Sequence, residues 1–494
     1  MVKQQYDEIA ARKHVTERCL IAADVDKTIL TQTSYGERSR FLRHVAPQLL
    51  EAAELGMKLA FVTGNSMSQL SDRFLKWLLE QLCHTDDLEL LQQFHFFCNS
   101  GGVYFRFPIT DKDIATALND NVSEQSAISR KIYQMLTCHE DGTTFVHPRF
   151  IDSRYLARTK IPDDEVDEIR NILDRCGRDY YTKVTRGKSS LGKNYDISKV
   201  MKEGKLEKPF VDIRPVKYGN ETDLHEATVQ LTLKPILSFL HGISDQYQER
   251  LFENDLRTKV INHIQGDLDA NNLGHYVARP GGLSSIDVTL EKLDKAYAME
   301  FLIDSLNLQG STRKGQRFGT NAIYFGDEVI VGGGNDYPVT RIPGLLVFAV
   351  NPDKKLVPFL SHVFVPSSIL EGPEATKDVL SQLNKIASNC LKSWIPMKST
   401  SKDYQPHTSA IDCFKVKVFG DRIHSKIDYL KRSAKLNPEE WQILHAFVTL
   451  MHRDDPAARR WLAILIDELD AIMTQVTENP RVVQKGIGTS HPDN

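Results

Sequence analysis

Two aspartates separated by one residue follow a short apolar run near the N-terminus. The segment reads Asp24-Val25-Asp26-Lys27-Thr28 and comes directly after Leu20–Ala23. Alternate side chains of a continuing strand would point to opposite faces, but a turn at Asp24 would let both carboxylates enter one site. Neighbouring carboxylates repel each other unless a divalent cation neutralises them. One could then attack phosphorus while the other acts as general acid and base. The alternative is a solvated turn at a strand end.

A second polar cluster, Thr63-Gly64-Asn65-Ser66, stands between the apolar run Leu59–Val62 and a helical pattern. A hydroxyl group together with backbone N–H groups at a helix N-terminus makes a natural cradle for phosphate. The simpler interpretation is an N-cap, in which Asn65 or Ser66 satisfies the first helical turn. The two roles are compatible with each other.

Two further positions could complete such a site. Lys295 opens a helical pattern, and a fixed ammonium there could neutralise the charge that develops on a transferring phosphoryl group. A lysine at a helix start is more often simply solvated.

Asp327 ends an apolar run, and the glycine-rich stretch Gly332–Gly334 brings Asp336 back towards it. Oxygen ligands around a divalent ion need such convergence, although a glycine-rich surface loop has the same pattern.

Short apolar runs that end abruptly in small or polar residues precede most of these clusters. Runs of this length, bounded by turn signals, are typical of buried strands in a parallel sheet. Helical patterns over Arg40–Leu55 and Met67–Leu82 alternate with them, which predicts an α/β sheet with helices on both faces. Ligands bind at the carboxyl ends of such strands, so we expect the clusters to converge. The runs are Leu20–Ala23, Leu59–Val62, Phe94–Cys98, Ala322–Phe325 and Leu345–Val350.

The pattern changes in the middle and at the end of the chain, which predicts a three-part organisation. Residues 1–107 and 280–370 form a discontinuous Rossmann-like core, residues 108–279 an inserted α+β cap, and residues 371–494 a mostly helical extension. The cap pattern comprises helical stretches at Asp163–Cys176 and Ser244–Gly266 and strand-like ones at Tyr180–Thr185, Val211–Tyr218, Glu226–Leu233 and His275–Ala278. Apolar spacing in Glu439–Leu450 and Ala457–Val476 could, if exposed, support a homodimer.

Composition limits the class of protein and of partner. The chain has 494 residues, of which 41% are apolar and 26% charged, as in ordinary globular proteins. A net charge of −3 argues against a nucleic-acid partner. Seven scattered cysteines with no C-x-x-C pair indicate a reducing compartment rather than disulfides or a thiolate zinc site. The sixteen histidines show no helical pair with a nearby ligand set. Because no apolar stretch approaches the roughly 18 residues of a membrane span, we expect a cytoplasmic enzyme without a membrane partner.

The order of the clusters, an aspartate pair, a threonine, a lysine and an acidic loop, resembles the haloacid dehalogenase superfamily of phosphotransferases. The resemblance covers about residues 19–107 and 280–352, with the interruption where that superfamily carries an α/β (C2-type) cap. It implies that Asp24 is the phosphate-accepting nucleophile and Asp26 the general acid and base. The implied phosphate-binding residues are Thr63, Gly64, Asn65 and Lys295, and the implied Mg²⁺ ligands are Asp24, Asp26, Asp327 and Asp336.

Two segments narrow the resemblance within that superfamily. The loop Gly326–Asp336 is most similar to that of eukaryotic phosphomannomutases, although it is one residue longer. Ser285–Val288 is similar to that group and to sugar-phosphate phosphatases. The implied function is a magnesium-dependent phosphatase that acts on a small phosphorylated metabolite such as a sugar phosphate. A phosphomutase, or a degenerate member that acts as a binding or regulatory protein, stays open as an alternative.

Lys27 departs from the pattern of the family, which normally has glycine between the second aspartate and the threonine. A lysine with a positive φ there would cost about 1 kcal/mol. Its ammonium could instead add a cation beside the phosphate. The departure is the main reason to keep the degenerate alternative.

Overall fold

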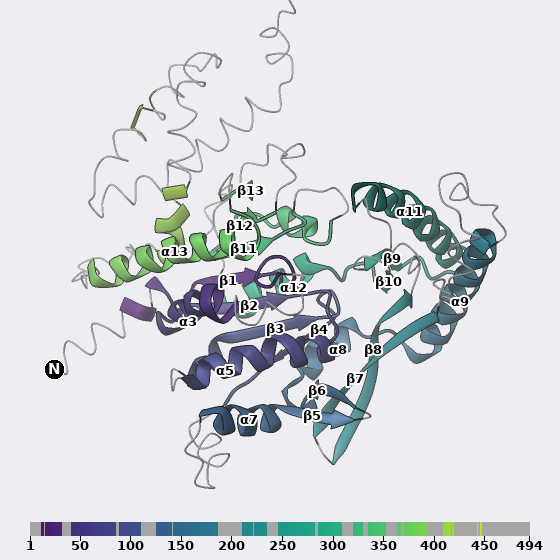
Figure 1. Cartoon of the computed structure of the whole chain (residues 1–494), viewed down its shortest axis with the longest axis horizontal. Coiled ribbons are helices and arrows are strands. Elements are labelled where there is room, and N and C mark those ends of the chain that lie inside the picture. Colours follow the sequence, from purple (N-terminus) through teal and green to yellow (C-terminus); the bar gives the residue numbers. More distant parts are fainter. Residues whose placement is uncertain are drawn as a thin grey trace, which may run out of the picture. The chain divides into compact units, whose positions relative to one another are not determined.

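The structure is a computed structural model of the whole chain (Figure 1). It describes residues 11–13, 15–31, 41–84, 88–109, 125–140, 142–185, 210–220, 222–234, 246–281, 285–308, 320–329, 334–351, 363–366, 370–393, 409–415, 417–418, 442 and 445–446. By its contacts the chain divides into a first unit, Met1–Phe61 with Met299–Asn494, and a second unit, Val62–Ala298. The core and cap boundaries expected at residues 107/108 and 279/280 stay predictions.

The first unit contains a parallel sheet with the strand order β13-β12-β11-β1-β2. All of its residues except Lys58 are buried, as parallel strands covered on both faces require. Where a strand was predicted here, the observed ends lie within one residue of the predicted ones. The strands are β1 (Leu20–Ala23), β2 (Lys58–Val62), β11 (Ala322–Gly326), β12 (Leu346–Ala349) and β13 (Val363–Phe364).

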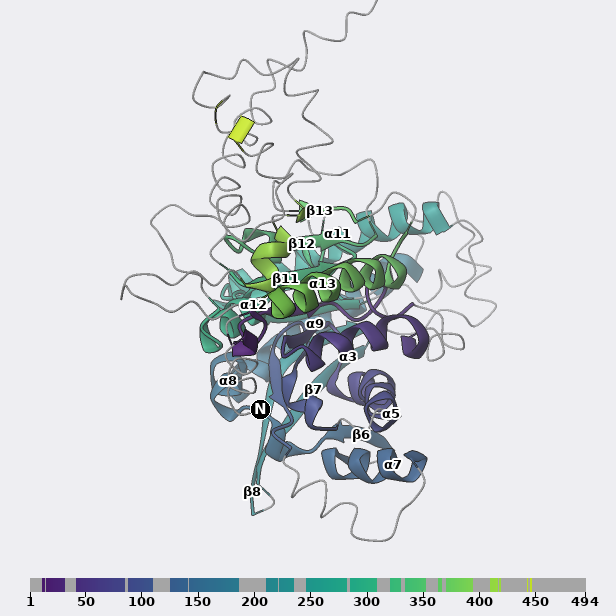
Figure 2. The ribbon, with the colours of Figure 1, turned by 90° about the vertical axis from the view of Figure 1, so that its left-hand side faces the viewer.

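Helices of the first unit hold the loop that follows β1. The π-helical turn η1 (Phe41–Val45) and α3 (Ala46–Glu54) fill the predicted helix Arg40–Leu55, and α13 (Pro373–Ser393) packs along them (Figures 1 and 2). At the start of α13, the Thr376 hydroxyl donates to the Thr28 carbonyl at 2.7 Å. A side chain on Gly372, where φ is 56°, would place its Cβ 2.7 Å from the Lys27 carbonyl oxygen. The start of α13 therefore packs on the backbone of Lys27 and Thr28.

The second unit begins with a long helical segment and a hairpin. The segment comprises α4 (Met67–Gln69), the π-helical turn η2 (Leu70–Leu75) and α5 (Lys76–His84), in agreement with the helix predicted over Met67–Leu82. After η3 (Leu88–Gln93) come the antiparallel strands β3 (Phe94–Cys98) and β4 (Val103–Arg106). The remaining small elements are α7 (Gln125–Leu136), the hairpin β5 (Thr137–Glu140) with β6 (Thr143–Val146), η4 (Pro148–Phe150) and α8 (Ser153–Thr159).

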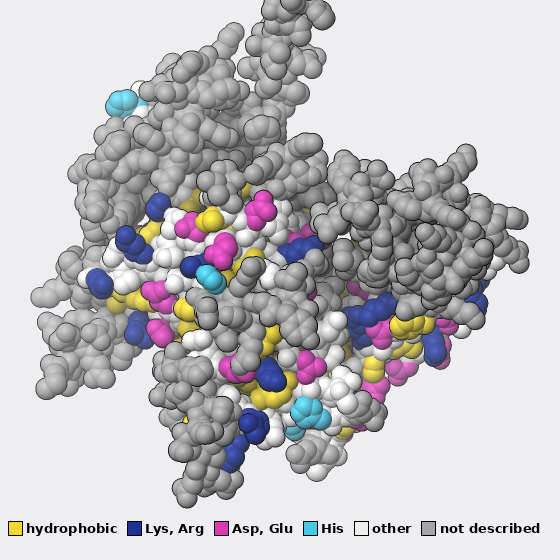
Figure 3. Space-filling model, in the orientation of Figure 1, with side chains coloured by type: hydrophobic (Ala, Val, Ile, Leu, Met, Phe, Trp, Pro, Cys, Tyr) yellow, Lys and Arg dark blue, Asp and Glu magenta, His cyan; other side chains and the backbone are white. Residues whose placement is uncertain are grey.

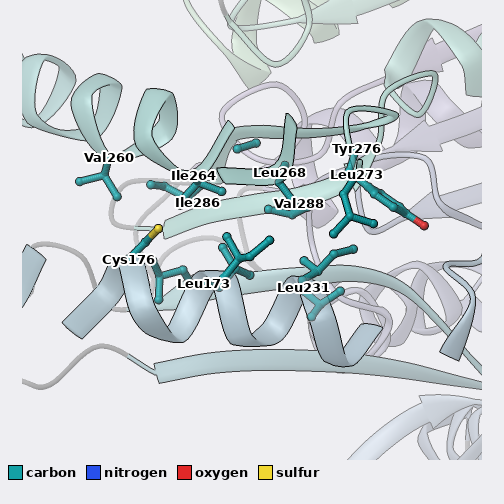
Figure 4. Close-up of a cluster of buried hydrophobic side chains, with 14 of the residues drawn as sticks. Leu173, Cys176, Leu231, Val260, Ile264, Leu268, Leu273, Tyr276, Ile286 and Val288 are labelled. Carbon is teal, nitrogen blue, oxygen red and sulfur yellow. The ribbon is translucent and has the colours of Figure 1, made fainter. Parts of the chain in front are cut away.

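A second sheet, antiparallel and four-stranded, lies in the second unit with the order β7-β8-β10-β9. Together with its two long helices it is called the cap layer below. The helices pack against each other and against the sheet, and apolar side chains of all these elements fill the space between them (Figure 4). The elements are β7 (Phe210–Asn220), β8 (Asp223–Lys234), β9 (Tyr276–Gly281), β10 (Ser285–Leu290), α9 (Asp163–Thr185) and α11 (Gln246–Ala270).

The fold is therefore α/β around the parallel sheet, with additional helices and antiparallel sheets in the second unit, as the sequence predicts. One local prediction is wrong, because Tyr180–Thr185 is not a strand but the last part of α9. Ile169, Leu173, Cys176 and Tyr180 all join the buried cluster, and their spacing of three and four residues is that of a helix face. Packing of α9 against α11 and the cap-layer sheet thus outweighs the strand propensity of the β-branched and aromatic residues in this segment.

Other expectations concern residues at the end of the chain and the surface. The predicted helices Glu439–Leu450 and Ala457–Val476 lie outside the described residues, except for Gln442, His445 and Ala446. No helix in the described part of the chain is long and apolar enough to cross a membrane. On the face drawn in Figure 3, basic and acidic side chains of described residues are interspersed.

Candidate active site

Three aspartates of the first unit converge at the carboxyl ends of neighbouring strands. β1 and β11 are parallel, with Ala23 opposite Phe325, and the Asp24 N–H donates to the Phe325 carbonyl at 2.9 Å. Asp24 and Asp327 therefore follow adjacent strand ends, and Asp336 returns to them. One carboxylate oxygen from each lies within 4.8 Å of the others. We call Asp24, Asp327 and Asp336 the acidic cluster.

Asp336 is the most firmly held of the three. It is 0% exposed, and both of its carboxylate oxygens accept hydrogen bonds. The Tyr324 hydroxyl donates to Oδ1 at 2.6 Å, and the Glu328 N–H donates to Oδ2 at 3.1 Å. Burial, followed by the negative charge of the acidic cluster, raises the pKa of the Tyr324 hydroxyl well above its ordinary value. The hydroxyl therefore keeps its proton and remains a donor to Asp336.

Tyr324 was not singled out from the sequence, where it lies within the apolar run Ala322–Phe325. The only signal in the sequence is a hydroxyl-bearing side chain inside a strand that is otherwise fully apolar. A buried tyrosine normally finds a partner for its hydroxyl. That rule predicts a buried partner near this strand end, but it does not identify Asp336.

Gly326 gives Asp336 its space. A Cβ atom built on Gly326 would lie 2.6 Å from Asp336 Cγ and 2.7 Å from its Oδ2. Real Cβ atoms are essentially never found so close to another heavy atom, so any side chain here would displace the carboxylate. The absence of a side chain at the end of β11 is thus part of how the acidic cluster is built.

Lys27 lies beside the acidic cluster and has the left-handed backbone conformation that favours glycine. Its φ is 58°, so the cost of about 1 kcal/mol expected for a lysine applies. Its Nζ lies 3.8 Å from Asp327 Oδ2, and the side chain is 27% exposed. The expected backbone strain is therefore present, and the ammonium lies next to a carboxylate of the acidic cluster; its expected place beside a phosphate stays a prediction. Asp26, in contrast, is not one of the three clustered carboxylates, so its catalytic and metal-binding roles stay predictions.

In the second unit, hydrogen bonds join the loop after β2 to the turn after β3. The Asn65 N–H donates to Thr63 Oγ1 at 3.1 Å. In turn the Asn99 N–H donates to the Asn65 carbonyl at 2.8 Å and the Ser100 N–H to the Thr63 carbonyl at 3.0 Å. Asn99 and Ser100 both have positive φ values, 51° and 56°. These hydrogen bonds hold the polar residues that follow β2 close to those that follow β3.

The capping role considered for this loop belongs to Ser66. Its side chain accepts from the Gln69 N–H, and the Gln69 side chain accepts from the Ser66 N–H, which forms a capping box. Thr63, Gly64 and Asn65 lie outside that box. Their predicted phosphate-binding role is neither required nor excluded by the cap.

Lys295 is fully buried at the first position of α12 (Lys295–Ser305). The expectation that a lysine at a helix start is solvated is therefore wrong here. Asp294 caps this helix by accepting from the Tyr297 N–H at 2.9 Å. A Cβ on Gly101 would lie 2.9 Å from the Asp294 carbonyl oxygen, so Lys295 follows a residue that packs on the turn after β3. A buried ammonium needs compensating partners, so its burial shows that Lys295 is held in place; its predicted role in binding phosphate stays a prediction.

Comparisons with known proteins find similarity only among solved structures. No family model matches the chain, and no curated protein matches it. The chain is similar to N-terminally truncated IMP-nucleotidase of Plasmodium falciparum, with 15% identity, a TM-score of 0.36, and coverage of 78% of this chain and 72% of that one. It is also similar to SMU.1108c of Streptococcus mutans (13% identity, TM-score 0.36, 76% and 99% covered). For the sucrose-phosphatase of Synechocystis, identity is 11%, the TM-score 0.32, and coverage 74% and 97%. At these TM-scores the chemistry of the site has to follow from its own residues.

Replacing Gly326 with alanine should damage the acidic cluster. The added methyl group would collide with Asp336, so we expect a loss of about 1–3 kcal/mol in the free energy of unfolding, measured by urea denaturation. Gly266→Ala on α11 is the matched control, because nothing lies within 4 Å of a Cβ there and alanine favours a helix. Equal urea midpoints for Gly326→Ala and the wild type would contradict this account of Gly326.

Two substitutions of Lys27 should separate strain from charge. Lys27→Gly removes both, whereas Lys27→Gln keeps a side chain at φ 58° and removes only the ammonium. Without metal, Lys27→Gln should be less stable than Lys27→Gly by about 1 kcal/mol. Added Mg²⁺ should raise the melting temperature of both variants more than that of the wild type, because the ammonium no longer opposes a second cation. Identical Mg²⁺-dependent shifts in all three proteins would show that Lys27 does not act on the acidic cluster.

Proposed function

We propose that this chain is a magnesium-dependent phosphate monoester hydrolase that uses Asp24 as its nucleophile. The observation that carries the proposal is the acidic cluster, in which three carboxylates lie within 4.8 Å of one another, largely buried at the ends of two parallel strands. Carboxylates this close repel one another, and a bound divalent cation relieves that repulsion. Lys27 supplies a single positive charge near Asp327, which leaves an excess of negative charge for a metal ion to balance.

The residues of the cluster suit magnesium. Mg²⁺ prefers oxygen ligands and is commonly held by one or two carboxylates together with substrate phosphate, and all three side chains offer carboxylate oxygens. Asp24, Asp327 and Asp336 would hold the ion, with Asp26 as a further expected ligand. When bound, the ion would neutralise negative charge on the phosphoryl group.

In the proposed reaction a carboxylate oxygen of Asp24 attacks the phosphorus atom of a monoester. The bond from phosphorus to the ester oxygen breaks, and Asp26 gives its proton to that oxygen. Asp26 then takes a proton from water, which attacks the aspartyl-phosphate and releases inorganic phosphate. Thr63, Gly64 and Asn65 would position the phosphoryl oxygens, and the buried ammonium of Lys295 would balance the charge that develops on them.

The substrate is proposed to be a small metabolite rich in hydroxyl groups, such as a sugar phosphate. One face of the cap-layer sheet is polar although it is largely buried. There Gln230 Nε2 donates to Thr232 Oγ1 at 3.0 Å, and Thr232 Oγ1 donates to Asp287 Oδ1 at 2.8 Å. Gln230 Oε1 is buried and has no hydrogen-bond partner among the described residues. An unsatisfied buried acceptor is costly, and a substrate hydroxyl would satisfy it.

Arg214 brings positive charge to the same polar face. Its guanidinium bonds to Asp212, and its charge acts on both Cys98 at the end of β3 and Asp287. A cation near the residues that follow β3 suits an anionic substrate. The free cysteines among the described residues agree with the proposed cytoplasmic compartment.

A screen of phosphate monoesters with Mg²⁺, read out as released phosphate, tests the proposal. Asp24→Asn should lower turnover of every accepted ester by about 10³-fold or more, while the urea midpoint shows that the variant still folds. Asp223→Asn is the control, because that side chain is 77% exposed on the β7–β8 hairpin, and its turnover should match the wild type.

The outcomes of this screen separate the three functions. Wild-type turnover by Asp24→Asn would overturn the role of Asp24. Transfer of the substrate's labelled phosphate to an isomeric product would favour a phosphomutase. If no ester is turned over and beryllium fluoride with Mg²⁺ forms no adduct on Asp24, the chain is a binding or regulatory protein instead.

A further inference from the structure

A second group of metal-ligating side chains lies in the cap layer, between α9 and α11. It consists of Cys176 on α9 and of His263 and Asp267 on α11, and one ligand atom from each lies within 4.8 Å of the others. We propose that this group, called the Cys176 site below, binds a transition-metal ion of the zinc type. The proposal is independent of the phosphatase reaction, which uses none of these residues.

The distances suit a tetrahedral ion. Cys176 Sγ lies 3.5 Å from Asp267 Oδ2, and His263 Nε2 lies 4.0 Å from the same oxygen. Ligand atoms bonded to a tetrahedral zinc ion at its usual bond lengths lie about 3.3–3.6 Å apart. His263 and Asp267 are four residues apart on one helix, so they share a face. Small side-chain rotations would bring all three atoms into bonding distance.

The donor atoms select the class of metal. Thiolate sulfur, imidazole nitrogen and carboxylate oxygen together are the ligand types of Zn²⁺, whereas Mg²⁺ and Ca²⁺ prefer oxygen alone. Binding would form a metal–sulfur bond and release the thiol proton to solvent. The thiolate of Cys176 and the carboxylate of Asp267 then balance the two charges of the ion. A water molecule would supply the fourth ligand.

Arg175 is the neighbour that most opposes this proposal, because its Nη2 donates to Asp267 Oδ2 at 2.9 Å. Without a metal ion the guanidinium already neutralises the carboxylate. Its side chain is 51% exposed, so it can withdraw or move to the other carboxylate oxygen. The guanidinium and a bound ion would compete for the charge of Asp267. Removing Arg175 should therefore tighten metal binding.

The site is exposed to solvent on one side and buried on the other. The His263 side chain is 43% exposed, whereas Cys176 is buried in the hydrophobic cluster that also contains Val260 and Ile264 (Figure 4). An ion could therefore enter past His263 and reach the thiol. Because Cys176 and Asp267 are 91 residues apart in the sequence, a bound ion would cross-link the two helices that cover the cap-layer sheet. We expect it to stabilise that layer.

The test uses the full chain after chelator treatment, titrated with Co²⁺ and then Zn²⁺. Co²⁺ bound to a thiolate gives a charge-transfer absorption band that the acidic cluster cannot produce, because it contains no sulfur. We expect about one equivalent of Co²⁺ to give this band, Zn²⁺ to abolish it by displacement, and Zn²⁺ to raise the melting temperature by several degrees. Arg175→Ala should bind Co²⁺ more tightly than the wild type.

Variants decide whether the band comes from these residues. Cys176→Ser should abolish it, and His263→Gln should weaken Co²⁺ binding at least about tenfold. Cys138→Ser on β5 and His225→Gln on β8 are the matched controls, because Cys138 is partly exposed and the His225 side chain is 53% exposed. Both should bind as the wild type does. If Cys176→Ser fails to fold, the exposed position His263 still carries the test.

A wild-type protein without the thiolate band would overturn the proposal, as would a band that survives in Cys176→Ser or unchanged binding by His263→Gln. Phosphatase activity gives the independent reading. Cys176→Ser and His263→Gln should keep the wild-type turnover of any accepted ester, and Asp24→Asn should keep the cobalt band. Failure of either proposal thus leaves the other standing.

Discussion

The first unit is organised around one constraint, which is the close approach of three carboxylates at the carboxyl ends of its parallel strands. Buried charges of like sign raise each other's free energy and are tolerated only with compensating donors or cations. The chain supplies a tyrosine hydroxyl and a backbone N–H to Asp336 and an ammonium to Asp327. Parallel pairing of β1 with β11 fixes the approach of Asp24, and the missing side chain of Gly326 leaves room for Asp336. One ammonium and two hydrogen-bond donors do not neutralise the charge of three carboxylates, so a bound cation would complete the charge balance of the cluster.

The neighbouring carboxylates explain why a lysine stands at the strained position 27. A lysine at φ 58° is unfavourable, yet from this position its ammonium reaches to 3.8 Å from Asp327 Oδ2. The loop is held from the other side by Asn351, whose amide donates to the Lys27 carbonyl at 3.2 Å, and by Gly372 and Thr376 at the start of α13. Local strain persists where the surroundings over-determine the backbone. The helix after the sheet therefore has a part in the geometry of a loop more than 300 residues earlier.

Much of the core could be predicted because its signals are local. Short apolar runs bounded by polar residues predicted β1, β3 and β11 to within one residue, and the same boundaries placed Asp24 and Asp327 at strand ends. Signals that depend on distant packing were missed. Tyr180–Thr185 has the composition of a strand, but its apolar spacing fits α9 once the cap layer is present. The burial of Lys295 and the partner of the Tyr324 hydroxyl likewise depend on tertiary contacts. Cys176 gave no metal signal in the sequence, because its partners come from a helix 91 residues away.

Two candidate metal sites in one chain raise the question of how each would receive the right ion. Zinc binds most ligand sets more tightly than magnesium does, so affinity alone would let zinc enter the acidic cluster. The two sites differ in donor softness, since the acidic cluster offers only oxygen and the Cys176 site adds sulfur and nitrogen. Soft donors increase the affinity for zinc far more than for magnesium. Lys27, whose ammonium lies 3.8 Å from Asp327 Oδ2, also lowers the affinity of the acidic cluster for any cation through charge repulsion. If zinc is scarce, it would therefore bind at the Cys176 site first, and the acidic cluster would be left to magnesium. Magnesium binds weakly to a few carboxylates alone, but the oxygen atoms of a bound phosphate would add further ligands.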